Sequence, residues 1–236
     1  MKKILLLSLI SFVCFNANSQ TVTQKSSIGI TIGPSFPLGD FGSKDLGNSE
    51  SGLAKVGGFL AIDYSYKFSK YFGAIVSAQG RMYSVDEKAL AAYAVPDGTG
   101  ASLSVTTGAW KMGAIMAGVF QVVPLTKDEK LNLEIRALGG YQSTSSPKLD
   151  VRISIPGMGS FQDSQESESS GSFAYLVGAG LKYSLSPAVA LKLSGDYNGA
   201  QPKFSVTSYP ADAPVTQQVR QSIGAFNVGV GLVIGF

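Results

Sequence analysis

The chain has 236 residues, of which 15% are charged, and its net charge of +3 falls to about +1 when the two lysines at the amino terminus are set aside. A charge this small gives no basic surface for nucleic acid. So few charged residues, together with 28 glycines, are also unusual for a soluble α/β enzyme. We expect a single all-β domain, because barrels of this length commonly form one unit.

The first residues have the pattern of a secretory signal peptide, which we place at 1–19. Two lysines precede an apolar run, Ile4–Phe15, that is too short to span a bilayer, and small residues follow it. Cleavage before Gln20 removes Cys14, the only cysteine, and leaves 20–236 as a barrel domain without a disulfide. A lipoprotein with Cys14 lipidated is the alternative, but the two residues before this cysteine are bulkier than such a site requires.

Eight later segments alternate apolar residues with small or polar ones, which is the period-two pattern of a strand with one apolar face. They begin at Ile28 and continue at 56–68, 72–82, 110–122, 131–141, 173–183, 189–197 and 225–236. Strands of about ten or more residues are long enough to cross a bilayer when tilted. We therefore predict an eight-stranded antiparallel up-and-down transmembrane β-barrel.

The connections between these segments alternate in length, as they do in outer-membrane barrels. Three are short (69–71, 123–130 and 186–188) and four are long (33–55, 84–108, 144–171 and 199–221). All ten prolines fall in these connections, where they remove no hydrogen bond from a strand ladder. Because the number of strands is even, we expect both ends of the mature chain in the periplasm.

Aromatic residues are expected at both interfaces of a membrane barrel. Twelve aromatic residues near strand ends share the apolar face of their strands, and we expect them to face lipid: Tyr66, Phe68, Phe72, Trp110, Phe120, Tyr141, Phe173, Tyr175, Tyr183, Tyr197, Phe226 and Phe236. In the fourth segment the predicted outer face also includes Met112, Ala114, Met116 and Val122. A soluble lipocalin-type barrel is the alternative, but the opposite face is rich in glycine and alanine, which fit a crowded lumen better than a solvated surface.

The last segment carries its apolar face without interruption to an aromatic carboxy-terminal residue. This face consists of Phe226, Val228, Val230, Leu232, Ile234 and Phe236. With the signal peptide, the ending GLVIGF and the stretch GPSFPLGDF at 33–41, the mature chain resembles small OmpA/OmpX-type outer-membrane barrels, including PorT-like proteins. The resemblance implies an outer-membrane location, contact with membrane lipid and lipopolysaccharide, and use of the last strand as a signal for the barrel-assembly machinery. We expect no periplasmic peptidoglycan-binding domain, because none follows the last strand.

Ionisable residues within the predicted strands lie on the face opposite the apolar one, which we expect to line the lumen. There, carboxylates can pair with basic groups and avoid the cost of charge in hydrocarbon. We predict a structural polar network of Asp63, Arg81, Glu134, Arg136, Lys182, Lys192 and Asp196, with Lys67 and Lys111 on the same face. A proton or substrate pathway is the alternative. Four bulky residues on this face would help to fill the lumen: Phe59, Tyr83, Leu138 and Leu176.

The chain contains no histidine, which argues against the lipases, acyl transferases and omptin-type proteases of membrane barrels, because these use histidine as a base. Ligands typical of zinc are also absent from the mature chain. We expect no enzymatic activity, no cofactor and no metal site. The third long connection holds Asp163, Glu166 and Glu168 among serines. We interpret it as a solvated, mobile loop, with weak calcium binding or contact with a basic partner as the alternative.

These observations favour a monomeric envelope-structural or surface-interaction protein that acts through its four long loops, which would contact lipopolysaccharide or an unknown protein. Binding residues commonly lie on loops that a rigid scaffold positions. An accessory barrel of a secretion system, or a narrow conduit for small apolar solutes, is the alternative. We do not expect a general porin, because an eight-stranded barrel is just wide enough for its own side chains.

Overall fold

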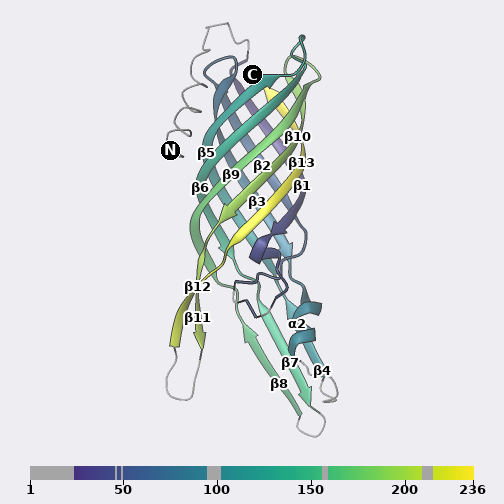
Figure 1. The fold of residues 1–236 in the computed structure, drawn as a ribbon, viewed down its shortest axis with the longest axis vertical. Coiled ribbons are helices and arrows are strands. Elements are labelled where there is room, and N and C mark those ends of the chain that lie inside the picture. Colours follow the sequence, from purple (N-terminus) through teal and green to yellow (C-terminus); the bar gives the residue numbers. More distant parts are fainter. Residues whose placement is uncertain (1–23, 46, 49, 95–101, 156–158, 209–214) are drawn as a thin grey trace, which may run out of the picture.

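The computed structural model describes residues 24–236 except 46, 49, 95–101, 156–158 and 209–214. The predicted signal peptide, its cleavage site and Cys14 lie outside the described residues. Eight long antiparallel strands form one closed barrel in the order β1-β13-β10-β9-β6-β5-β3-β2 (Figure 1). The strands are β1 (Ser26–Leu38), β2 (Gly57–Lys67), β3 (Phe72–Ser84), β5 (Ala109–Pro124), β6 (Leu131–Ser145), β9 (Ser169–Ser184), β10 (Val189–Ala200) and β13 (Ile223–Gly235). The predicted fold class and strand number are confirmed.

The first and last barrel strands form the seam that closes the sheet. β1 pairs with β13 in an antiparallel register that places Ile30 opposite Leu232, and Ser26 and Phe236 exchange backbone hydrogen bonds of 3.1 and 2.9 Å. Closure leaves the barrel without an unpaired edge strand, which would otherwise offer its N–H and C=O groups to other chains.

The outer face of the barrel is a belt of exposed apolar side chains, as the alternation in the sequence predicts. Ile30 on β1, Val230 on β13 and Ile135 on β6 are among these residues. Such a continuous apolar belt is unfavourable in water and matches the hydrocarbon of a bilayer, so the barrel is a transmembrane barrel. Within the described part of the chain, no helix is both long enough and apolar enough to cross a membrane.

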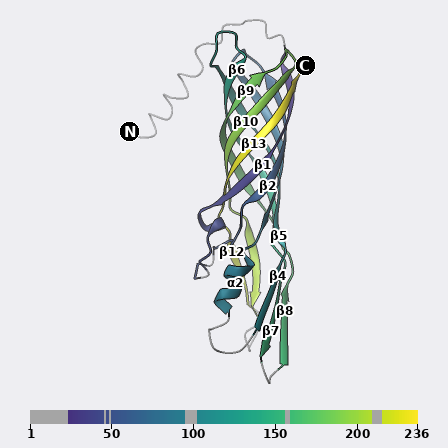
Figure 2. The same ribbon diagram turned by 90° about the vertical axis from the view of Figure 1, so that its right-hand side faces the viewer.

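The long connections are folded and extend from one end of the barrel, whereas the short turns lie at the other end (Figures 1 and 2). We call these the loop end and the short-turn end. The loop end carries a three-stranded sheet in the order β4-β7-β8 and a two-stranded sheet of β11 and β12. Its elements are η1 (Gly39–Gly42), α2 (Glu87–Ala94), β4 (Ser102–Thr107), β7 (Leu149–Ile155), β8 (Gly159–Gln165), β11 (Lys203–Ser208) and β12 (Val215–Arg220).

Three prolines lie in strands, so the prediction that all ten lie in connections is wrong. Pro34 and Pro37 belong to β1, and Pro124 is the last residue of β5. The β1–β13 ladder is interrupted at Gly33 and Pro34, between the pairs that Ile32 and Ser35 form with β13. On the β13 side, no ladder pair therefore needs the N–H that Pro34 lacks, although Pro34 remains paired with Gly58 of β2.

The inside and outside faces of β5 are the reverse of those predicted. The apolar set that begins at Trp110 and ends at Val122 faces the lumen and is buried, whereas Ile115 faces outward and is 69% exposed. Pairing fixes this orientation, because Trp110 lies opposite inward-facing Tyr83 and Ile115 lies opposite outward-facing Tyr141. β5 is apolar on both faces, and its bulkier face fills the lumen. Trp110 and Phe120 therefore do not belong to the outer aromatic girdles.

The other ten aromatic residues of the predicted girdles lie on outward faces. Eight of them are exposed: Tyr66, Phe68, Tyr141, Phe173, Tyr175, Tyr183, Phe226 and Phe236. Phe72 and Tyr197 are half-buried. The six apolar residues of the predicted assembly signal on β13, from Phe226 to Phe236, also face outward and are exposed.

Candidate functional site

A cluster of ion pairs crosses the barrel lumen around Arg136 of β6. The guanidinium donates from Nε and Nη2 to the two carboxylate oxygens of Asp196 on β10, at 2.9 and 2.7 Å. Its Nη1 donates to Asp63 Oδ2 on β2, at 2.8 Å. All three residues are at least 96% buried. Two-point pairing of this kind gives arginine–carboxylate contacts both strength and directional specificity.

Lys192 and Glu134 form the second part of this cluster. Lys192 Nζ lies 2.6 Å from Glu134 Oε1 and 3.9 Å from Asp63 Oδ2. The other oxygen of Asp63 accepts a 2.6 Å hydrogen bond from the hydroxyl of Ser77. The cluster thus unites three carboxylates with two cations, and nearly every charged group has a direct partner, as burial requires.

Two residues of the predicted network lie outside this cluster. Arg81 is buried near the loop end and donates through Nη2 to the side-chain oxygen of Gln142, while its Nε and Nη1 have no hydrogen-bond partner among the described residues. Lys182 lines the short-turn end with Lys67. The structure therefore brings together Asp63, Glu134, Arg136, Lys192 and Asp196, and separates Arg81 and Lys182 from them.

Lys111 is the one ionisable strand residue whose predicted position in the lumen is wrong. It faces outward and is exposed. The reason is the reversed orientation of β5: Lys111 follows Trp110, and the two side chains must point to opposite faces of the strand.

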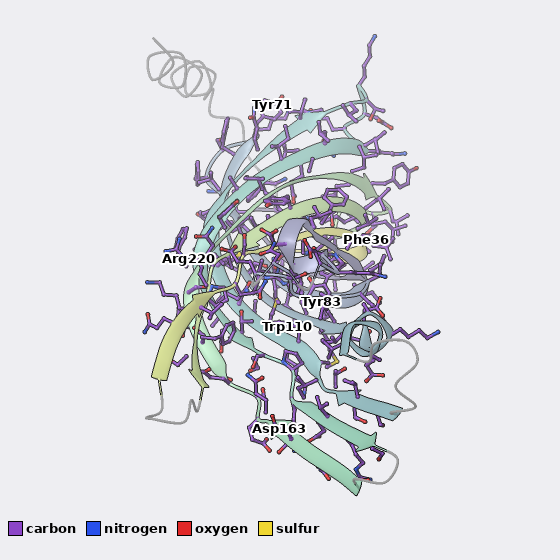
Figure 3. All side chains as sticks on the ribbon, turned by 60° about the horizontal axis from the view of Figure 1, so that its bottom comes forward. Phe36, Tyr71, Tyr83, Trp110, Asp163 and Arg220 are labelled. Atoms are coloured by element: carbon purple, nitrogen blue, oxygen red, sulfur yellow. The ribbon has the colours of Figure 1, made fainter. Side chains whose placement is uncertain are left out.

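An aromatic cluster closes the lumen at the loop end. Phe41 of η1 and Tyr83 of β3 are fully buried, with ring centroids 5.0 Å apart, and Trp110 packs edge-on against Phe41 at 5.6 Å. Phe204 of β11 packs against Trp110 at 6.0 Å. Seen from the loop end, Tyr83 and Trp110 lie next to each other among the barrel strands (Figure 3). We call these four residues the aromatic plug.

Hydrogen bonds fix the aromatic plug in place. Trp110 Nε1 donates to the carbonyl oxygen of Gly52 at 2.9 Å, and the hydroxyls of Tyr83 and Ser35 lie 2.6 Å apart. Position 52 requires glycine, because the Cβ atom of any other residue would lie 2.6 Å from the carbonyl oxygen of Phe41. Phe41 and Phe204 were not predicted to lie here, because they are outside the predicted strands and have no period-two pattern to mark them.

Buried side chains fill the lumen at and around the aromatic plug and the ion pairs, and the four that were predicted to fill it are among them. Phe59, Tyr83, Leu138 and Leu176 are all buried. The inward face of β5 adds Met116 and Phe120, which are 1% and 3% exposed. This packing agrees with the interior width expected of an eight-stranded barrel.

The three acidic residues of the third long connection have separate surroundings. Asp163 lies within strand β8, opposite Val151, rather than in a loop, and it is exposed far from the barrel (Figure 3). Glu166 pairs with Lys148 at 3.0 Å, and Glu168 accepts from the backbone N–H of Ser205 at 3.1 Å. Among the described residues, no three acidic, cysteine or histidine side chains are grouped to hold a metal ion.

Contacts between connections hold the loop end together. Glu168, before β9, binds Ser205 of β11, and Gln221 Nε2 donates to the carbonyl oxygen of Glu50 at 2.6 Å. Glu87 of α2 accepts from the backbone N–H and the hydroxyl of Thr107 on β4, at 2.9 and 3.0 Å. The described parts of the connections thus form one connected surface.

Comparisons with known proteins found similar barrels among solved structures only. No family model matches the chain, and no curated protein matches it. The attachment invasion locus protein Ail of Yersinia pestis is 18% identical with a TM-score of 0.44, and the alignment covers 90% of this chain and 99% of Ail. Neisserial surface protein A is 11% identical with a TM-score of 0.46, covering 89% and 97% of the two chains. The outer membrane protein OprG of Pseudomonas aeruginosa is 13% identical with a TM-score of 0.48, covering 89% and 96%. With its own closed barrel of eight antiparallel strands, this chain resembles small eight-stranded outer-membrane barrels, as its sequence predicts.

Proposed function

We propose that this chain is a monomeric outer-membrane barrel that acts through its loop end, as an envelope-structural or surface-interaction protein without enzymatic activity. In this proposal residues 1–19 are a signal peptide, the barrel-assembly machinery reads β13, and both ends of the mature chain lie in the periplasm. The loop end then faces the outside of the cell, where it meets lipopolysaccharide or a protein partner.

The contrast between a filled lumen and a folded loop end supports this proposal. The lumen is occupied by ion pairs and by the aromatic plug. The connections instead build two sheets beyond the barrel and carry exposed polar side chains such as Asp163 and Arg220. A rigid scaffold that presents ordered connections is the usual arrangement of a recognition surface.

The alternative, a narrow conduit for apolar solutes or an accessory barrel of a secretion system, predicts different behaviour. Buried charges such as Arg136 and Lys192 offer an apolar solute no favourable path. In planar bilayers we expect the purified protein to show little or no stable conductance. Large, reproducible channels from the monomer would overturn the conclusion that side chains fill the lumen.

Replacing the loop elements one at a time tests the proposed function. One variant replaces 148–166, which includes β7 and β8, with a short Gly-Ser turn, and another replaces 203–220, which includes β11 and β12. Arg136→Gln and Arg81→Gln serve as lumen variants. Binding of labelled lipopolysaccharide and cross-linking to surface partners are measured on intact cells, and a heat-dependent shift in gel mobility verifies barrel formation.

The proposal predicts that a loop replacement abolishes binding while the barrel remains folded, and that the lumen variants bind as well as the wild type wherever they fold. Full binding by every loop variant, with loss in Arg81→Gln or in Arg136→Gln, would refute it and assign the activity to the lumen.

A further inference from the structure

The lumen contains more basic than acidic groups, and the excess is not evenly distributed. Five inward-facing residues are basic, namely Lys67, Arg81, Arg136, Lys182 and Lys192, whereas three are acidic, namely Asp63, Glu134 and Asp196. The three carboxylates form ion pairs with Arg136 and Lys192. Lys67 and Lys182 form no ion pair with any described carboxylate, and both lie toward the short-turn end.

The position of Lys182 adds repulsion from a second lysine. In the β9–β10 register Lys182 lies directly opposite Lys192, and both side chains point inward. Like charges directly opposite each other in a sheet repel. Glu134 pairs with Lys192 at 2.6 Å, and no described carboxylate lies within ion-pair distance of Lys182.

A cavity of about 180 Å³ opens at the same place. Lys67, Lys182 and Lys25 line it, and Asn132, which is opposite Lys182 in the β6–β9 register, adds an amide donor. The one carboxylate on its wall, Glu129, is already bound to Lys70 at 2.7 Å. The cavity is smaller than the roughly 300–1,000 Å³ of pockets for drug-sized molecules. Its lining therefore suits a small anion.

We propose that the short-turn mouth of the barrel binds a small anion carrying phosphate or carboxylate groups, held by Lys67 and Lys182 from opposite strands with Lys25 at the rim. The anion supplies the negative charge that the lumen lacks and separates Lys182 from Lys192 electrostatically. The site lies at the end opposite the loops, so it is independent of the function proposed for the loop end.

Calorimetric titration of the protein with inorganic pyrophosphate tests this site. The full protein is purified from membranes and placed in nanodiscs of zwitterionic lipid. The variants are Lys67→Gln, Lys182→Gln and their combination, with Lys182→Arg as a charge-preserving variant. Lys111→Gln is the matched control, since Lys111 is a strand lysine that faces outward near the loop end.

We expect the wild type, Lys111→Gln and Lys182→Arg to bind pyrophosphate with similar affinity. Lys67→Gln and Lys182→Gln should each raise Kd by about tenfold, the effect of losing one close charge pair, and added salt should weaken binding. Equal Kd values for the wild type and the folded variant Lys67→Gln or Lys182→Gln would overturn the proposal, as would an equal loss in Lys111→Gln.

The same titration in nanodiscs that contain phosphatidylglycerol distinguishes two sources of the anion. If anionic lipid abolishes pyrophosphate binding, a lipid head group occupies the site in the membrane. If pyrophosphate still binds with the same affinity, the natural ligand is a soluble anion. Absence of binding by the wild type in zwitterionic nanodiscs would refute the site for either source.

Discussion

The guanidinium of Arg136 holds both oxygens of Asp196, at 2.9 and 2.7 Å, and joins strands that are not neighbours in the barrel. β9 separates β6 from β10, and Asp63, the third partner, lies on β2. The backbone ladder links only adjacent strands, so this ion pair adds a connection across the lumen that the ladder cannot provide.

Arg136→Gln should destabilise the folded barrel by about 3–5 kcal/mol, because it leaves Asp63 and Asp196 buried without their main partner. Denaturant unfolding in lipid vesicles measures the change in the free energy of unfolding. Arg220→Gln, an exposed position on β12, is the control and should change it by less than about 0.5 kcal/mol. Equal stabilities of the two variants would show that the lumen ion pairs contribute nothing measurable.

Trp110, the only tryptophan, should be shielded from lipid because it is 6% exposed and faces the lumen. Its fluorescence should be blue-shifted and should change little when bilayers of brominated lipid replace ordinary ones. As a control, Phe173→Trp in a Trp110→Phe background places the fluorophore on the outer face, at a position that is 70% exposed, and should be strongly quenched. Strong quenching of the wild type would instead support the outward orientation of β5.

Deletion of Phe236 should lower the yield of assembled barrel severalfold, because it removes the terminal aromatic residue and both backbone hydrogen bonds to Ser26 at the seam. Phe236→Tyr keeps these features and should assemble normally. Leu138→Met, a volume-conserving change in the lumen, should also assemble well. Heat-dependent gel mobility of membrane fractions gives the folded yield. Unchanged yield after the deletion would rule out Phe236 as part of an assembly signal.

The contact between α2 and β4 should weaken in acid. Hydrogen bonds from the backbone N–H of Thr107, and then from its hydroxyl, hold the pKa of Glu87 below its ordinary value of 4.5. A carboxyl whose pKa is lowered by folding stabilises the contact above its ordinary pKa, and this contribution is lost as the pH falls through the folded value.

Hydrogen-exchange protection of the Thr107 amide measures this effect. Protection should fall below a pH of about 4.5 in the wild type, and Glu87→Gln should show reduced protection that no longer depends on pH in this range. Protection that stays constant down to pH 3 in the wild type would contradict the assigned hydrogen bond.

The barrel was predictable from the sequence wherever a strand has one strongly apolar face. β13 is such a strand, since every second residue from Phe226 to Phe236 is apolar and exposed. β5 was not, because Ile115 and Val119 outside and Met112 and Met116 inside make both of its faces apolar. Periodicity then gives two equivalent answers, and only the pairing with β3 and β6 selects one.

In the candidate sites, too, some features were predictable from the sequence and others were not. The lumen positions of Asp63, Glu134, Arg136, Lys192 and Asp196 followed from strand alternation alone. Strand tilt and stagger decide which of these residues pair, and they also place Arg81 and Lys182 apart from the cluster. A single sequence does not reveal tilt or stagger. The aromatic plug depends on Phe41 and Phe204 from connections that meet only in the folded chain.

The pairing of β4 with β7 ties together two loops that belong to different hairpins, with Val105 opposite Val151. A one-residue insertion in either strand would turn its side chains to the other face of the small sheet. The sequences of the two loops therefore cannot change independently during evolution. Aligned descendants of this chain should show correlated substitutions between 102–107 and 149–155, and weaker correlation of either segment with 203–220, whose strands form a separate sheet.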